Sequence, residues 1–283
     1  MTLLTVSTVK GAPGGSTVAL LLARVVAATL VGDGTCVLAE CDLSGGDLAP
    51  RLGLPAIPGV ASLALAARHG LTVEVLLAHT QASDCSPRLR VLPGVAGPEQ
   101  GMALSWIMGD LGQALADPSI VAVADLGRLR GDVDDNDRLR RIATANLLVT
   151  KDDVASLLHS RAAVETARHA GTIFGIVLTG ERTRRVSQVS GAIGAEVVGE
   201  VRFDPKALSL VLHPRRPTTR TWKALRCARG LISDAEAIVS RLSGPDCPLE
   251  QDFRTSALAG GGTDSPARSG VTGRARQRAV LVG

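Results

Sequence analysis

The sequence predicts an α/β fold, a doubly wound and mostly parallel sheet with helices on both faces. Apolar runs of strand length alternate along the chain with longer segments of helical periodicity, as in sheets whose strands are joined by crossover helices. A glycine-rich loop follows the first apolar run, and acidic residues follow two later runs. Because such sheets bind ligands at the carboxyl ends of their strands, these loops mark the predicted site.

The expected strands are short and rich in Val, Leu, Ile and Ala. They span Leu3–Val9, Thr35–Cys41, Leu89–Leu92, Ile120–Ala124, Asn146–Thr150, Thr172–Leu178 and Glu196–Val201. The expected helices lie between them, where apolar residues recur at helical spacing. They cover residues 16–31, 47–53, 59–67, 99–116, 133–144, 152–170 and 183–194, and a last helix runs from Thr219 to Leu242.

The chain is expected to divide after residue 244. Its 283 residues, 45% of them hydrophobic, suit one large domain over 1–244 followed by a tail. Residues 245–283 lack periodicity and contain many Gly, Ser and Pro residues, which predicts a flexible tail. The basic far end, 274–282, is short and weakly amphipathic. We expect it to be solvated, with contact to a membrane surface as the alternative.

Composition restricts the class of protein less than the motifs do. The net charge of +4 permits contact with nucleic acid or anionic lipid without requiring either. The five cysteines form no C-x-x-C pair, which is typical of reduced thiols in the cytoplasm. We see no signal-peptide pattern, and the longest apolar run, Val18–Val31, is too short to span a bilayer. We therefore expect a cytoplasmic protein, with peripheral contact to membrane or nucleoid as an option.

The loop after the first strand has the context of a phosphate-binding loop. It reads Lys10-Gly11-Ala12-Pro13-Gly14-Gly15-Ser16-Thr17 and leads into a long apolar helix. Loop N–H groups and a helix N-terminus together cradle phosphate. In the pattern G-x-x-x-x-G-K-[ST] a lysine precedes the hydroxyl residue, and Gly15 stands in its place here. The alternative is a turn that binds nothing.

Acidic residues at two strand ends predict a metal site near this loop. Glu40 and Asp42 are two positions apart and therefore point to the same side, where both can face Mg²⁺ and water. Asp125 follows the apolar strand Ile120–Ala124 in a Walker B arrangement. With the hydroxyl of Ser16, these three acids are the predicted metal-binding residues. Solvated acids at strand ends are the alternative.

The loop resembles the deviant Walker A motif, KGGxGKTT, of the MinD/ParA group of P-loop ATPases. Lys10 matches the first lysine of that motif, which in the group reaches across a nucleotide-sandwich dimer to the phosphates of the partner. Each of the other loop residues can be compared with this motif. Gly11, Gly14 and Thr17 match, Ser16 is a conservative match, and Pro13 fills the variable position, whereas Ala12 and Gly15 depart from the pattern.

Later segments extend the resemblance over roughly residues 3–212. Glu40 and Asp42 resemble the D-x-D of switch I, with Asp42 at the aspartate that positions the attacking water. Asp125-Leu126-Gly127 resembles the D-x-x-G of switch II, one residue short. Residues 179–182 replace the asparagine that the group often uses for adenine. The chain is similar to degenerate members of the group, the actinobacterial MinD-like and CpaE-like proteins.

The resemblance implies a nucleotide-dependent homodimer that binds ATP or ADP with Mg²⁺ and hydrolyses ATP slowly. It assigns catalytic roles to Lys10 and Asp42 and phosphate binding to residues 11–17. The dimer would act on a secretion or pilus apparatus, a division site or a chromosome, through an unidentified protein partner. The alternative is a pseudo-ATPase adaptor that works by protein contacts.

A third possibility is weak nucleic-acid binding at the nucleoid. Two arginine trios carry this hypothesis: Arg138, Arg140 and Arg141, and Arg182, Arg184 and Arg185. Arginine side chains on one helix face can contact DNA phosphates. Solvated basic faces are the simpler interpretation of each trio.

Overall fold

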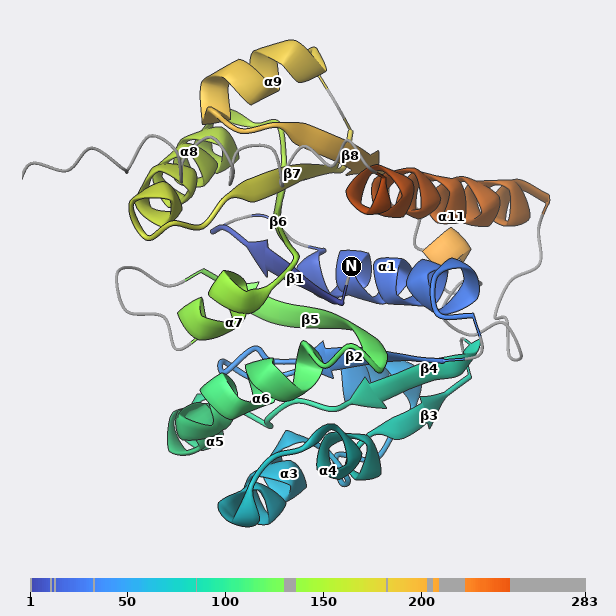
Figure 1. The fold of residues 1–283 in the computed structure, drawn as a ribbon. Coiled ribbons are helices and arrows are strands. Elements are labelled where there is room, and N and C mark those ends of the chain that lie inside the picture. Colours follow the sequence, from blue (N-terminus) through green and yellow to red (C-terminus); the bar gives the residue numbers. More distant parts are fainter. Residues whose placement is uncertain are drawn as a thin grey trace, which may run out of the picture.

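The computed structural model describes residues 2–10, 12, 14–32, 34–84, 86–129, 136–181, 183–202, 206–208 and 222–244. These residues form an eight-stranded sheet in the order β3-β4-β2-β5-β1-β6-β7-β8 (Figure 1). The strands are β1 (Leu3–Thr8), β2 (Thr35–Glu40), β3 (Gln81–Ser83), β4 (Ser86–Leu92), β5 (Ile120–Arg128), β6 (Ala145–Thr150), β7 (Phe174–Thr179) and β8 (Val197–Val201). Only β3 runs antiparallel, against β4, among the described pairs.

Helices cover both faces of the sheet, as the sequence predicts (Figure 1). One face carries α1 (Gly15–Thr29), α2 (Leu48–Leu52) and α11 (Trp222–Ser243). The other carries α3 (Val60–Ala66), α4 (Val73–Ala78), α5 (Pro98–Leu104), α6 (Met108–Leu115), α7 (Asp137–Ile142), α8 (Val154–His169) and α9 (Val186–Ile193), with 3-10 turns at Ala67–His69 and Ser105–Ile107. The doubly wound α/β fold is confirmed.

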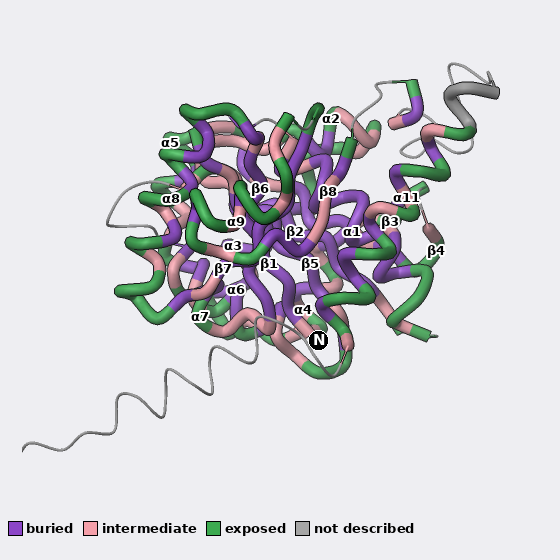
Figure 2. Tube along the Cα trace, turned by 90° about the horizontal axis from the view of Figure 1, so that it is seen from above, coloured by how far each residue is buried: buried purple, intermediate pink, exposed green. Residues whose placement is uncertain are grey.

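The core consists of aliphatic side chains that alternate between the two faces of the strands. On β1, Leu4 and Val6 contact the α1 side, whereas Leu3 contacts the opposite side. Adjacent residues on β6 do the same, Leu147 toward α1 and Leu148 toward α8. Figure 2 shows the strands and α1 as the buried centre of the molecule. This alternation also places Glu40 and Asp125 on the α1 side, because they follow Leu38 and Val123 by two residues.

Several predicted boundaries differ from the structure. The sequence does not predict β3 and α4, which are short and lack strong periodicity. The predicted helix 99–116 is interrupted at Ser105–Ile107, and β5 continues to Arg128, so Asp125 lies within the strand and not at its end. The predicted tail 245–283 lies outside the described residues. Within the described ranges, no helix is long and apolar enough to cross a membrane.

Candidate functional site

The turn between β1 and α1 brings backbone donors to the carboxyl end of β1. Gly14 caps α1 with φ of 106°, a left-handed conformation that glycine adopts without a steric penalty. The N–H groups of the first helical turn have no partner within the helix and therefore suit an anion. Lys10 is exposed and Ala12 is buried. Gly11 and Pro13, both predicted phosphate-binding residues, lie outside the described residues.

Gly15 packs against Thr8 and leaves no space for a side chain as the two residues stand. A Cβ on Gly15 would lie 2.3 Å from the Thr8 Cγ2 methyl, far inside van der Waals contact. The hydroxyl of Thr8 donates to the Gly127 carbonyl over 3.4 Å, which links β1 to β5. Any side chain at position 15 therefore requires Thr8 to move. This contact of Thr8 is not predictable from the sequence, because it depends on how β1 and α1 pack.

Asp125 is the buried acid of the site. Its side chain is 1% exposed, and it accepts hydrogen bonds from the Ser16 hydroxyl and, at 3.0 Å, from the Gly127 N–H. Its Oδ2 atom is buried and has no hydrogen-bond partner among the described residues. Burial, with smaller contributions from Glu40 and Asp42, raises the pKa of Asp125 to about 6. A buried carboxylate oxygen without a donor favours a bound cation or its water.

Glu40, the register partner of Asp125 on β2, is already occupied by backbone donors. Its Oε1 accepts from the N–H groups of Asp47 at 2.7 Å and Leu48 at 2.8 Å. Its Oε2 accepts from the Gly94 N–H at 2.9 Å. Burial raises the pKa of Glu40, while these three bonds lower it. The longer arm of glutamate therefore joins the end of β2 to the loop before α2 and to the end of β4.

Asp42 lies beside Gly127, near the end of β5. Its Oδ1 accepts from the Ser44 N–H at 2.7 Å. Its Oδ2 would lie 2.0 Å from a Cβ on Gly127, whose φ is +63°, so position 127 requires glycine on both counts. The structure thus brings Ser16, Glu40, Asp42 and Asp125 to one end of the sheet, as the sequence predicts.

The residues present suit Mg²⁺ only together with a phosphate ligand. In the described part of the chain, no three His, Cys, Asp or Glu side chains converge to hold a metal ion. Mg²⁺ commonly binds through one or two carboxylates, substrate phosphates and several waters. The open Oδ2 of Asp125 and the Ser16 hydroxyl fit that mode.

Comparison with solved structures identifies the fold. The ParA-family ATPase of Chlorobium tepidum TLS aligns with a TM-score of 0.62 at 18% identity, over 90% of this chain and 97% of that one. The cell-division ATPase MinD of Pyrococcus furiosus gives 0.61 at 18% identity, over 85% and 99%. Pyrococcus horikoshii MinD, complexed with Mg-ADP, gives 0.61 at 14% identity, over 85% and 95%. This chain has the MinD/ParA fold. No family model matches the sequence, and neither does any curated protein.

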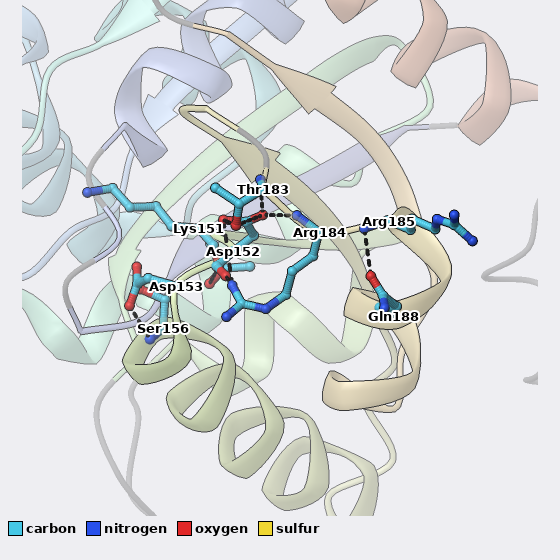
Figure 3. A network of polar contacts seen from close by, with 9 residues as sticks. Lys151, Asp152, Asp153, Ser156, Thr183, Arg184, Arg185 and Gln188 are labelled. Carbon is cyan, nitrogen blue, oxygen red and sulfur yellow. Dashed lines mark hydrogen bonds and ion pairs between the residues drawn. The ribbon is translucent and has the colours of Figure 1, made fainter.

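In this MinD/ParA fold, the loops after β6 and β7 are tied together by Asp152 (Figure 3). Its Oδ2 accepts from the backbone N–H groups of Thr183 at 2.5 Å and Arg184 at 2.8 Å. Burial opposes ionisation, but these bonds leave the pKa of Asp152 below its usual value. The Arg184 guanidinium donates in turn to the Asp152 carbonyl. The polar network therefore fixes Thr183 and Arg184, which directly follow the residues that replace the asparagine expected for adenine.

The structure takes one member out of each arginine trio that was considered for nucleic-acid binding, Arg140 and Arg184, while Arg138 and Arg141 are exposed. Arg140 is 4% exposed and forms an ion pair with Asp137 at 2.6 Å, so it cannot reach a DNA surface. Arg184 is held by Asp152, whereas Arg185 is exposed and points away from that network (Figure 3). Arg182 lies outside the described residues.

Proposed function

We propose that this chain is a nucleotide-dependent dimerisation switch that binds ATP or ADP with Mg²⁺ at the loop between β1 and α1. The observation that carries the proposal is the buried Oδ2 of Asp125, which has no hydrogen-bond partner among the residues that the structure describes. The same carboxylate is hydrogen-bonded to Ser16 in the first turn of α1. A cation beside an anion-binding helix N-terminus is the pairing that a Mg-nucleotide needs.

Each predicted residue has a place in this proposal. The loop of residues 11–17 surrounds the phosphates, whose oxygens accept from the backbone N–H groups of Gly14, Gly15 and Ser16. Ser16, Asp42 and Asp125 hold Mg²⁺ or its waters. Bound Mg²⁺ would supply positive charge to the phosphate oxygens. Glu40 accepts three backbone hydrogen bonds and thereby holds the loop that contains Asp42. It does not bind Mg²⁺ in this proposal. Asp42 orients water, and the exposed Lys10 reaches the phosphates of a second copy.

We infer that hydrolysis is slow. Phosphoryl transfer depends on positioning and on neutralisation of the charge that develops on phosphate. The side chain that usually supplies a cation inside the loop is missing at Gly15. Binding therefore outlasts hydrolysis, and the nucleotide acts chiefly by stabilising the dimer.

We propose that the dimer positions or regulates cellular machinery such as a secretion or pilus apparatus, a division site or a chromosome. The fold shared with MinD and ParA supports this class of function. Its site of action would be the cytoplasm, at a membrane surface or nucleoid where a protein partner recruits it.

A non-catalytic adaptor is the second candidate. The contact between Gly15 and the Thr8 methyl favours it, because the phosphate loop is packed in a way that excludes the lysine. In that case the fold serves protein contacts and the acids at the sheet edge bind no nucleotide.

Light scattering in the presence and absence of Mg-ATP tests the proposal. We expect the wild type to double its mass with Mg-ATP, and Lys10→Ala to remain monomeric. Lys151→Ala is a matched control, since Lys151 follows β6 at the same edge of the sheet. A mass unaffected by nucleotide contradicts the switch and favours the adaptor. Equal loss in both variants contradicts the specific role of Lys10.

A further inference from the structure

A cationic side chain already lies beside the phosphate loop, although the loop itself lacks the expected lysine. Arg51, on α2, donates from Nη2 to the Thr17 hydroxyl at 2.8 Å. Thr17 is in the first turn of α1 and is buried, while the Arg51 side chain is 30% exposed. The guanidinium thus extends from α2 to the first turn of α1 and remains partly exposed to solvent.

The surroundings of this cation would favour an anion beside it. The N-terminal end of α1 carries the positive end of the helix dipole, and its first turn has no acidic residue. The ion-pair partner that the structure gives Arg51 is Asp47, at 3.5 Å. The Asp47 side chain is 61% exposed, so water screens this pair and it contributes little. A phosphate at the end of α1 would neutralise both the dipole and the guanidinium.

The two hydroxyls of the first turn of α1 are held by groups of opposite charge. Ser16 donates to Asp125, whose Oδ2 is buried and has no partner among the described residues. Thr17 accepts from Arg51. The first arrangement suits a metal ion and the second suits an anion. Together they match the two charged parts of a Mg-nucleotide.

We infer that Arg51 binds the phosphates of the nucleotide and supplies the positive charge that is missing at Gly15. The inference rests on the proposed function. A guanidinium has five N–H donors, so the bond to Thr17 leaves others for phosphate oxygens. Its planar geometry suits phosphate better than a lysine ammonium does. The charge comes from α2, so the packing of Gly15 against Thr8 is left intact.

Two substitutions of similar length separate charge from packing. Arg51→Met keeps an unbranched apolar stem and removes the charge, whereas Arg51→Lys keeps the charge. The control is Arg161→Met on α8, because Arg161 also pairs with an acid four residues away, Glu165 at 2.8 Å. Binding of a fluorescent ATP analogue with Mg²⁺ is measured for all four proteins, together with the Tm of each without nucleotide.

We expect Arg51→Met to weaken binding at least about tenfold, the loss of one charge-assisted hydrogen bond. Arg51→Lys should weaken binding less than Arg51→Met does, because it keeps the charge without the planar geometry, and Arg161→Met should bind as the wild type does. Arg51→Met with wild-type affinity overturns the inference. Equal weakening by Met and Lys, with equal loss of Tm, also overturns it, because Arg51 then only anchors α2. A wild type that binds no nucleotide overturns the proposed function itself.

Discussion

The contact between Thr8 and Gly15 predicts a strong energetic coupling between these two positions. In Gly15→Ala the new Cβ would lie 2.3 Å from Thr8 Cγ2, while the next atom, Thr8 Cβ, is at an ordinary 3.8 Å. Overpacking of one methyl into a filled space costs about 1–3 kcal/mol. Thr8→Ser removes only the interfering methyl and keeps the hydroxyl that donates to the Gly127 carbonyl. Gly15→Ala should therefore destabilise the wild type by about 2 kcal/mol and be close to neutral with Thr8→Ser.

Urea unfolding of the four proteins of this double-mutant cycle measures the coupling. The account predicts an interaction free energy of about 2 kcal/mol between the two substitutions. If the two free-energy changes add within about 0.5 kcal/mol, the predicted coupling is wrong, because the Thr8 methyl can then rotate away at no cost. The same geometry predicts that Gly15→Lys folds with wild-type stability only when it is combined with Thr8→Ser.

Two further predictions concern the acids of the site. The pKa of Asp125 is raised from 3.8 to about 6 in the fold. The contribution of Asp125 to the free energy of unfolding is therefore greatest below pH 4 and is lost as the pH rises through about 6. Asp125→Asn should remove roughly 3 kcal/mol of this pH dependence, measured as unfolding free energy from pH 4 to 7; parallel wild-type and variant curves would contradict it. Glu40→Ala leaves the N–H groups of Asp47, Leu48 and Gly94 without their acceptor and should cost about 3 kcal/mol or more, whereas the exposed Asp47→Ala should cost under about 1 kcal/mol. A loss for Glu40→Ala no larger than that of the control would show that water replaces the carboxylate.

The sequence predicts the architecture well because burial of apolar side chains produces a pattern of apolar residues along each strand and helix. Strands buried on both faces appear as mostly apolar runs, continuous in Ile120–Ala124, and seven of the eight described strands follow from such runs. The missed elements, β3 and α4, are three and six residues long. Elements this short depend on tertiary contacts more than on their own periodicity.

The site is only partly visible in the sequence. Motif spacing brings Ser16, Asp42 and Asp125 together, because strand order places their loops at one edge of the sheet. The role of Glu40 depends on three backbone N–H groups from other segments. Such contacts leave no pattern in the sequence from which they could be predicted. Two further contacts are visible only in the folded structure. Thr8 and Gly15 belong to no motif that would predict their contact, and Arg51 and Thr17 are 34 positions apart in the chain.

Equilibrium binding of a fluorescent ATP analogue with Mg²⁺ to the wild-type chain tests the central claim most directly. The account predicts saturable, Mg²⁺-dependent binding that ATP and ADP displace and that Ser16→Ala weakens, even though position 15 carries no lysine. No saturable binding at millimolar nucleotide, in a protein whose thermal unfolding shows it to be folded, would contradict the account and leave the adaptor as the function of this fold.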